Sequence, residues 1–444
     1  MLSTRDNEAL CRVGPSTVMG DLLRRFWMPV LQSEQLPGPD CDPVELRLLG
    51  EDLVAFRDSS GRVGLVEALC PHRRAPLFYG RNEEGGLRCI YHGWKYDVEG
   101  RCIDMPTEPP EFSFQDKVRA QAYPVVESAG FLWTYMGPPD KTPALPDLEW
   151  TRLPADQRYA VGYRQYCNFV QAMEGDIDSA HAPWLHGMIA GPEAGDIKQR
   201  LAKGGGLVNT FGVTTARTEQ GYYSPLVPPR WVVEDLPCGV MGANRRDAGP
   251  DSYYWRVNLF MLPIYTTFPE QTDNRGHGHI WIPIDDEHTQ VWCVTWAPGE
   301  PLPQQEKDNV LGGPSPHIGT LDPATGRLRA CWENRFFIDR ASQRSDSFTG
   351  IRGVREQDTA VVEGMGAIVD RSKEHLGTSD SLIIGMRRRL LNAARALARG
   401  EEPHPATHPE VYRTRAWSQV LKRVPDEAFI ADQQVQRLLE TVVP

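Results

Sequence analysis

The stretch Cys70-Pro71-His72, followed after sixteen residues by Cys89-Ile90-Tyr91-His92, decides the fold of the first part of this chain. Each half supplies one cysteine and one histidine, in the order C-x-H and then C-x2-H. A zinc finger instead groups two cysteines first and two histidines later. The alternating order indicates a metal centre in which each loop contributes ligands to two different metal ions.

That order is typical of a Rieske 2Fe–2S cluster, in which one iron takes two cysteines and the other takes two histidines. Imidazole is neutral where thiolate is anionic, so the exchange of two Cys for two His raises the reduction potential. Cys70, His72, Cys89 and His92 are therefore predicted cluster ligands, and the centre is predicted to carry electrons. A structural zinc module stays open as an alternative.

The bulk composition is that of an ordinary globular protein. At about 150 residues per domain, 444 residues predict two or three domains. The formal net charge of −11 argues against nucleic acid and anionic membranes as partners. The first residues turn polar at once, and no apolar run reaches about 18 residues. We expect a cytoplasmic protein whose other seven cysteines are reduced thiols.

Short alternating or apolar runs at 44–48, 53–56 and 63–66, with turn residues between them, predict an all-β region. The Pro-rich segment 136–143 predicts its end. We therefore expect an N-terminal arm over 1–37, an all-β cluster domain over 38–140 and a second domain over 141–444.

The second domain shows both kinds of periodicity. Aromatic and β-branched runs at 254–261, 279–283 and 291–296 predict strands of an antiparallel sheet. An apolar face repeated over 383–397, closed by Gly400, predicts a long C-terminal helix. Gly- and Pro-rich segments at 191–250 and 301–330 are interpreted as long loops. The fold class is α+β.

A second constellation lies around residue 180. Asp178 and His181 are three residues apart and would share a helix face. His186 is too far round an ideal helix, but Pro183 would break the helix and let it return. Two His and a distant carboxylate form the facial triad of a non-haem Fe(II) oxygenase. Alone, the pattern also fits two ordinary core or surface histidines.

Several stretches resemble one family. They include RVGP at 12–15, LLRRFW at 22–27, LLGEDLVAFRD at 48–58, GRNEEGGLRC at 80–89, YHGWKYD at 91–97 and QAMEGDIDSAH at 171–181. With the cluster motif, they resemble the oxygenase α-subunits of Rieske non-haem iron oxygenases, and most of all the phthalate-dioxygenase-like group. The resemblance implies an all-β Rieske domain joined to an α+β catalytic domain with C-terminal helices. It implies two cofactors, a Rieske 2Fe–2S cluster and a mononuclear Fe(II).

The resemblance also assigns roles to single residues. Asp358 matches the third iron ligand beside His181 and His186, and Glu356 and Glu363 are weaker candidates. Asp178 matches a carboxylate that connects the cluster of one subunit to the iron of the next, which implies a homo-oligomer of the trimer or hexamer-of-trimers type. Asn168 and Gln171 are expected to hydrogen-bond near the iron, or alternatively to cap a helix or satisfy the core.

The implied activity is that of a terminal oxygenase. Electrons from a flavin/iron–sulfur reductase would let O2 hydroxylate an aromatic substrate, by cis-dihydroxylation or by monooxygenation with O-demethylation. A carboxylated substrate would need an arginine, for which Arg245, Arg246 and Arg256 are candidates. The alternative is a Rieske electron-transfer protein fused to a binding module without a catalytic iron. Arg74 stands where the family usually has glycine.

Overall fold

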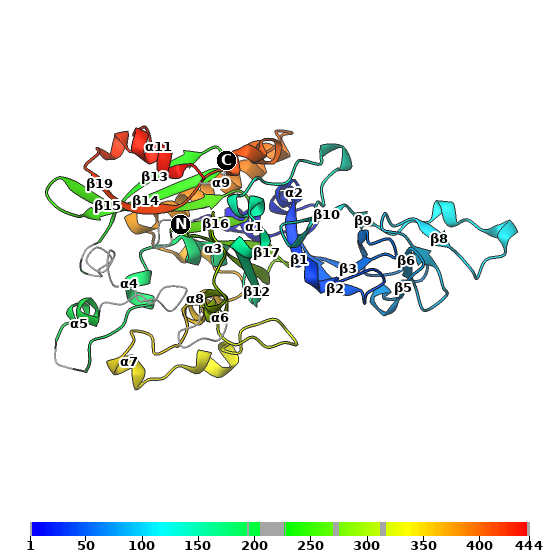
Figure 1. Cartoon of the computed structure of the whole chain (residues 1–444), viewed down its shortest axis with the longest axis horizontal. Helices are drawn as coiled ribbons and strands as arrows, with labels where there is room; N and C mark the ends of the chain where they lie inside the picture. The colour runs from blue at the N-terminus through cyan, green and yellow to red at the C-terminus, as the bar shows by residue number, and fades with distance from the viewer. Residues whose placement is uncertain are drawn as a thin grey trace. The chain divides into compact units, whose positions relative to one another are not determined.

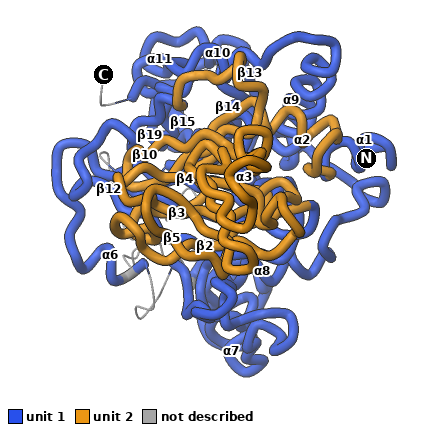
Figure 2. The backbone as a smooth tube through the Cα atoms, turned by 90° about the vertical axis from the view of Figure 1, so that its right-hand side faces the viewer, with its two compact units in different colours: residues 1–11, 146–281, 286–444 blue, residues 12–145, 282–285 orange. Residues whose placement is uncertain are grey.

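The computed structural model describes residues 2–192, 195–204, 226, 228–269, 275–310 and 317–441. The chain forms two compact units, which Figure 2 shows in different colours. One unit contains residues 12–145 and 282–285, and the other contains residues 1–11, 146–281 and 286–444. The predicted arm over 1–37 is thus divided at Cys11, with its larger part in the smaller unit.

The smaller unit is built from three antiparallel sheets, as the short alternating runs predict. The first has the order β1–β11–β10, the second β2–β3–β4–β9 and the third β5–β6–β7–β8. The strands are β1 (Met28–Gln32), β2 (Val44–Leu48), β3 (Glu51–Arg57), β4 (Val63–Glu67), β5 (Arg81–Glu83), β6 (Gly86–Arg88), β7 (Lys95–Tyr96), β8 (Cys102–Asp104), β9 (Ala122–Tyr123), β10 (Val125–Ser128) and β11 (Phe131–Thr134), with helix α2 (Val18–Leu23) before them. The predicted strands at 44–48, 53–56 and 63–66 coincide with β2, β3 and β4.

The core of this unit surrounds the two cysteines of the motif. Phe56, Val66, Leu87 and Tyr96 pack with Cys70 and Cys89 in one buried cluster. Cys70 follows β4, and Cys89 lies between β6 and β7. The strands therefore fix the bases of two loops, and the loops carry the four predicted ligands.

The larger unit is built on an eight-stranded antiparallel sheet in the order β12–β18–β17–β16–β15–β14–β13, with β19 paired to β15. Its strands are β12 (Arg158–Gln165), β13 (Arg230–Leu236), β14 (Gly239–Asp247), β15 (Ser252–Met261), β16 (Tyr265–Pro269), β17 (Gly276–Pro283), β18 (Thr289–Trp296) and β19 (Trp417–Lys422). Figure 1 shows β13, β14, β15 and β19 side by side. The strands predicted at 254–261, 279–283 and 291–296 lie in β15, β17 and β18.

Helices accompany this sheet. They are α1 (Thr4–Cys11), α3 (Phe169–Ile177), α4 (Ala182–Leu185), α5 (Ile197–Gly204), α6 (Gln304–Val310), α7 (Ser342–Ser345), α8 (Val354–Gly364), α9 (Ser381–Ala398), α10 (His404–Thr407) and α11 (Gln433–Leu439). The helix predicted over 383–397 lies within α9. Glu174 of α3 accepts hydrogen bonds from Arg371 at 2.9 Å and from Arg387 of α9 at 2.6 Å. This buried charge cluster ties α3 to α9. No helix among the described residues is long and apolar enough to span a bilayer.

The interpretation of 191–250 and 301–330 as long loops is wrong in part, since α5 and α6 lie within them and the end of the first forms two strands. Residues 230–236 and 239–247 form the hairpin β13–β14 at the end of the sheet. The pattern does not reveal it because β14 is buried on both faces and includes Gly242 and Asn244, so neither alternation nor a β-branched run marks it. Gly242 is required there, since a Cβ at this position would approach Leu382 of α9 to 2.5 Å. The parts of these loops at 193–194, 205–225, 227 and 311–316 lie outside the described residues.

Candidate metal centres

The two loops of the first motif repeat one backbone design. The amide of Arg74 donates to the carbonyl of Cys70 at 2.9 Å, and the amide of Gly93 donates to the carbonyl of Cys89 at 2.9 Å. Both residues have positive φ, 57° at Arg74 and 78° at Gly93. A left-handed residue four positions after each cysteine therefore closes each loop. This explains why glycine is expected at 74, because glycine adopts such angles at no steric cost.

The four predicted cluster ligands lie together. Cys70 and Cys89 are buried, and the rings of His72 and His92 lie 4.5 Å apart between centroids. The His72 ring stacks on Trp94 at 4.1 Å with an interplanar angle of 4°. Among the described residues, the buried Nδ1 of His72 has no hydrogen-bond partner. Two adjoining thiols and an imidazole nitrogen without a hydrogen-bond partner fit a 2Fe–2S cluster.

Polar groups around the cysteines favour a bound thiolate. Burial raises the pKa of Cys89, and the backbone N–H groups of Tyr91 and His92 oppose that rise. The phenol oxygen of Tyr96 lies 3.3 Å from Cys70 Sγ, and burial raises the pKa of this phenol. Tyr96 therefore stays protonated, and it is the donor when Cys70 is a cluster thiolate, which has no proton of its own. Hydrogen bonds to the sulfurs are one of the means by which a protein sets a cluster's potential.

The site around His181 and His186 differs in local structure from the one that the sequence predicts. Helix α3 ends at Ile177, so Asp178 and His181 do not share a helix. Instead His181 and His186 flank the short helix α4, and Pro183 lies in its first turn rather than breaking a longer helix. Proline suits that position because its missing N–H would be unbonded there anyway. Across this single turn, His181 Nε2 and His186 Nε2 approach to 3.2 Å.

Helix α8 brings the third group to this pair. Asp358 Oδ1 lies 3.5 Å from His181 Nε2 and 3.2 Å from His186 Nε2. The three atoms form a triangle with the spacing of adjacent ligands around one ion with bonds of about 2.1 Å. They occupy one side of such an ion and leave the other side open. The donor set and its spacing fit a mononuclear non-haem iron.

Charged and polar neighbours fix each of the three side chains. Burial opposes ionisation of Asp358, but His186 and Arg355 outweigh it and hold the pKa of this carboxyl well below its usual range. Burial likewise opposes protonation of His181, yet Asp178 and Asp358 raise its pKa to about 10. The site is therefore electrostatically prepared for positive charge.

Gln357, Arg355 and Asp176 also lie around the three side chains, and no motif in the sequence marks them. Gln357 Oε1 lies 2.6 Å from His186 Nδ1, and Arg355 Nη2 lies 3.4 Å from Asp358 Oδ2. Asp176 Oδ1 lies 3.3 Å from Arg355 Nη1. All three are close in sequence to predicted ligands, which is the one available signal. Their roles follow from how α3 and α8 pack, which no local pattern reveals.

Asn168 and Gln171 do not contact this site; they take the alternative role of cap and core residue. Asn168 caps α3 by accepting from the amide of Val170, and its own amide donates to the carbonyls of Cys11 and Asp286. Gln171 donates to the carbonyls of Val362 and Gly366, so it joins α3 to α8. Both side chains are used in packing the helices that position the ligands.

The other carboxylate candidates are also placed elsewhere. Glu363 accepts from the amide of Tyr166 and pairs with Arg327 at 2.8 Å. Glu356 is buried, and burial raises its pKa to about 7. Asp358 is the carboxylate that reaches both histidines.

The arginine candidates lie on opposite faces of the sheet. Arg245 grips Asp426 with two hydrogen bonds at 2.6 and 2.9 Å, so its carboxylate-binding geometry is already used within the chain. Arg256 and Asn258 are two residues apart on β15, so their side chains lie on the same face of the sheet. The amide of Asn258 donates to Ser179 Oγ at 2.6 Å. Arg256 therefore lies on the face that holds the end of α3. Arg246 is buried and donates to Asn244 at 2.8 Å.

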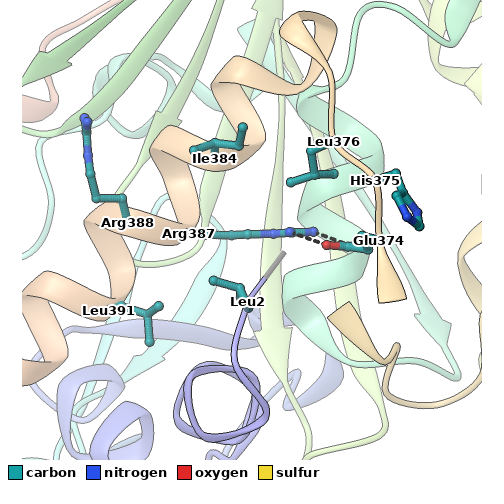
Figure 3. Close-up of a pocket in the computed structure, with 8 residues that line it drawn as sticks. All are labelled: Leu2, Glu374, His375, Leu376, Ile384, Arg387, Arg388 and Leu391. Atoms are coloured by element: carbon teal, nitrogen blue, oxygen red, sulfur yellow. Dashed lines mark hydrogen bonds and ion pairs between the residues drawn. The ribbon is translucent and has the colours of Figure 1, made fainter. Parts of the chain in front are cut away.

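A separate cavity of about 530 Å³ lies beside α9 (Figure 3). Leu2, Ile384 and Leu391 give it an apolar lining. Two of its charged groups are engaged with each other, since Arg387 donates to both carboxylate oxygens of Glu374 at 2.6 and 2.8 Å, and a third, Arg388, pairs with Asp235. None of the three predicted iron ligands lines it, so it is not the catalytic pocket.

Two family models match the chain. The Rieske [2Fe-2S] domain matches residues 26–124, and a model described as LigXa C-terminal domain like matches residues 239–435. The first match excludes the zinc-module alternative for the loops at Cys70 and Cys89.

Curated relatives match over most of the chain. The oxygenase subunit of 3-chlorobenzoate-3,4-dioxygenase from Comamonas testosteroni is 36% identical, with 89% of each chain covered. The phthalate 4,5-dioxygenase oxygenase subunit of Pseudomonas putida is 38% identical, over 90% of this chain and 88% of the relative. The 5,5'-dehydrodivanillate O-demethylase oxygenase subunit of a Sphingobium species is 33% identical, over 91% and 83%. All three are named oxygenase subunits, which supports the oxygenase prediction over an electron-transfer protein.

Solved structures share the fold. A crystal structure of dicamba monooxygenase with 3,6-dichlorosalicylic acid has a TM-score of 0.56 at 16% identity, covering 85% of this chain and 98% of that one. A variant of NdmA from Pseudomonas putida with theobromine also has a TM-score of 0.56 at 16% identity, covering 92% and 98%. The predicted combination of an all-β Rieske domain and an α+β domain with an antiparallel sheet is confirmed.

Proposed function

The chain belongs to the oxygenase subunits of Rieske non-haem iron oxygenases, and we propose that it hydroxylates a carboxylated aromatic substrate with O2. It is an oxidoreductase whose cofactors are a Rieske 2Fe–2S cluster and a mononuclear iron. In the proposal Cys70, His72, Cys89 and His92 hold the cluster, within a domain at 38–140. His181, His186 and Asp358 hold the iron, within a domain at 141–444. The observation that carries it is the approach of these last three side chains to within 3.5 Å.

The chain's own residues prepare the iron site. When bound, the cluster supplies single electrons and the iron supplies open coordination positions for O2. Asp178 Oδ2 lies 3.5 Å from His181 Nδ1, and Gln357 accepts from His186 Nδ1. These contacts hold the Nδ1 protons, so each ring presents Nε2 to the metal. Arg355 neutralises part of the charge of Asp358 and fixes its second oxygen.

Asp178 is also the proposed entry point for electrons. One of its oxygens accepts from the amide of Ala180 at 2.7 Å, and the carboxylate is part-exposed, so a further donor can reach it. His72 and His92 are half-buried, so a neighbouring subunit can reach their edges. We therefore place the cluster of one subunit against Asp178 of the next, in a trimer or a hexamer of trimers. Short through-bond contacts of this kind suit electron transfer.

The substrate class rests on the relatives' names and on one arginine. The names chlorobenzoate, phthalate and dehydrodivanillate all denote aromatic carboxylates. Arg256, on the sheet face that holds the end of α3, is the proposed partner of the substrate carboxylate. Arg245 is not proposed for this role, because its guanidinium already donates two hydrogen bonds to Asp426. Two of these relatives are named dioxygenases and one is named an O-demethylase. We therefore propose either cis-dihydroxylation or O-demethylation as the reaction of this chain.

Members of this family take electrons from a reductase, and a flavin/iron–sulfur reductase is the proposed type. A cytoplasmic location is part of the proposal. It is supported by the seven cysteines outside the cluster motif, none of which forms a disulfide, as expected in a reducing compartment.

The test is a substrate screen of the full-length enzyme with a flavin/iron–sulfur reductase and NADH. Benzoates, phthalate isomers and methoxylated benzoates are offered, and substrate-dependent O2 uptake, product structure and released formaldehyde are measured. We expect the wild-type enzyme to turn over at least one of these acids. The variant His181→Ala should lose this turnover and keep the cluster spectrum of the wild type. Failure of every aromatic acid would remove the substrate class. About two irons per chain in the wild type, instead of about three, would revive the electron-transfer alternative.

A further inference from the structure

Three buried histidines form a second cluster in the larger unit. His277 and His279 are two residues apart on β17, so their side chains share one face of the sheet. His317 joins them from the segment between α6 and α8. One ligand nitrogen from each ring lies within 4.8 Å of the other two, and each residue is only 1% exposed.

The spacing of the rings fits a single ion. Their centroids lie 5.0 Å apart for His277 and His279, 5.2 Å for His277 and His317, and 5.9 Å for His279 and His317. Nitrogen ligands about 2.0–2.1 Å from one zinc ion lie roughly 3.3 Å from each other, which small side-chain movements achieve here.

Polar neighbours hold two of the rings by Nδ1. Thr295 Oγ1 is hydrogen-bonded to His277 Nδ1 at 2.9 Å, and Asp176 Oδ1 lies 2.8 Å from His279 Nδ1 in an ion-pair contact that lacks hydrogen-bond geometry. In each ring Nε2 lies on the opposite side from these partners. A carboxylate or hydroxyl on one imidazole nitrogen with a metal on the other is the usual arrangement at protein metal sites.

Ring nitrogens of His279 and His317 have no hydrogen-bond partner within the described part of the chain. His279 Nε2 and both ring nitrogens of His317 are buried without a hydrogen bond. Buried polar atoms are almost always satisfied, so each exception needs a cause. A shared metal ion would satisfy His279 Nε2 and one nitrogen of His317 at once.

The charged groups nearest the cluster are Asp176 and Arg355, and burial decides the protonation of the rings. Burial lowers the pKa of both His277 and His317, so these rings are neutral, the form that binds metals. Burial would raise the pKa of Asp176, but His279 and Arg355 outweigh it and lower the pKa to about 2. The one guanidinium of Arg355 faces two carboxylates, Asp176 at 3.3 Å and Asp358 at 3.4 Å. Because Asp358 belongs to the proposed iron site, Asp176 and Arg355 balance each other, and a metal is indicated by the positions of the three rings.

We propose that His277, His279 and His317 bind a divalent transition-metal ion, with zinc as the expected occupant. Zinc accepts three imidazoles readily and has no geometric preference that would conflict with the site. The carbonyl of His317 accepts from the amide of Arg355 at 3.2 Å in the first turn of α8. The ion would thus link β17 to the helix that carries Asp358. This site is separate from His181, His186 and Asp358 and does not rest on the proposed function.

The first test is metal analysis of untagged, full-length enzyme purified without chelators. We expect about one zinc per chain besides the iron. The variant His317→Ala should lose the zinc and keep the cluster spectrum, whereas His375→Ala, an exposed histidine near α9, should keep it. His181→Ala should lose the mononuclear iron and keep the zinc, so failure of one site is distinguishable from failure of the other.

A second measurement needs no variant. X-ray absorption at the zinc edge of the wild-type enzyme should show three imidazole nitrogens at about 2.0 Å. If His317→Ala does not fold, this spectrum decides the question. One equivalent of zinc is added to the enzyme, and unbound metal is removed by gel filtration. The proposal is overturned if the enzyme then retains less than about 0.1 zinc or other additional metal per chain. Zinc bound equally by His317→Ala, or sulfur ligands in the spectrum, would overturn it too.

Discussion

The four proposed cluster ligands lie on two loops of the smaller unit, whereas the three proposed iron ligands lie at the two ends of α4 and on α8 in the larger one. The cluster loops are set by backbone bonds, from Arg74 to Cys70 and from Gly93 to Cys89. The iron ligands are set by side chains, Asp178, Gln357 and Arg355. One centre is therefore shaped by short-range chain geometry and the other by tertiary packing. Substitutions near the iron should alter the affinity for iron and the rate of turnover. Substitutions near the cluster should alter the reduction potential of the cluster or the stability of its domain.

The largest effect is expected at Asp178, because it serves both an iron ligand and the proposed route for electrons. Asp178→Asn keeps the size of the side chain but weakens its grip on the Nδ1 proton of His181. We expect turnover to fall about 100-fold, the upper end for such supporting residues, with iron content and cluster spectrum unchanged. Steady-state O2 uptake and single-turnover reoxidation of the reduced cluster measure the two steps separately.

The exposed Asp370→Asn in the same unit is the matched control and should behave as the wild type. Turnover of Asp178→Asn within twofold of the wild type would show that electrons reach the iron by another path.

A smaller effect is expected at Gln357, which supports one ligand only. Gln357→Leu removes the acceptor 2.6 Å from His186 Nδ1 and leaves the ring free to rotate. We expect iron affinity to fall about 10- to 30-fold, the lower part of the range for this kind of contact. Competition with a chelator, followed by iron analysis, measures the affinity.

Gln357→Glu should restore most of that affinity because its carboxylate still accepts from His186. A variant Gln357→Leu that binds iron as the wild type does would mean that packing alone orients His186. The cluster potential should be unchanged in both variants.

The same contrast explains which features can be predicted from the amino-acid sequence. The cluster ligands lie in one short stretch with an unusual order of residue types, so the sequence alone indicates their chemistry. The sequence also points to His181 and His186 but not to their geometry, because Pro183 lies in the first turn of a helix where a break is expected. Gln357, Arg355 and Asp176 carry no such signal because each acts across an interface between α3, α8 and the sheet. The role of Asn168 likewise depends on where α3 begins, since its position before that helix makes it a cap.

Tyr96 tests the cluster side of the comparison. Its phenol donates to Cys70 Sγ, and this bond stabilises the reduced cluster more than the oxidised one because reduction adds negative charge. Tyr96→Phe should therefore lower the reduction potential, by about 60 mV if the bond is worth tenfold in the one-electron equilibrium. A spectroscopic redox titration measures it.

Tyr79→Phe, at a residue exposed on the same unit, should leave the potential unchanged. A potential for Tyr96→Phe equal to or above that of the wild type would remove Tyr96 from the residues that set it.

The smallest effect is expected at Arg74, the position that corresponds to Gly93 in the other loop. A non-glycine residue at φ 57° costs about 1 kcal/mol, and Arg74→Gly removes that cost. The change also removes the ion pair of Arg74 with Glu67 at 2.5 Å, worth about 0–1 kcal/mol at this half-exposed site, and it increases the freedom of the unfolded chain. These contributions oppose each other, so we expect a net change in unfolding free energy below about 1 kcal/mol.

Thermal unfolding, followed by the cluster absorption, measures this change, and the midpoint should move by no more than about 2–4 °C. Glu67→Gln separates the two contributions, since it breaks the ion pair but keeps the left-handed arginine, and it should be slightly less stable than the wild type. Because Glu67 already balances the charge of Arg74, the reduction potential of Arg74→Gly should match that of the wild type. A clear shift in potential would show instead that the cation acts on the cluster, and that the two loops differ in electrostatics as well as in backbone cost.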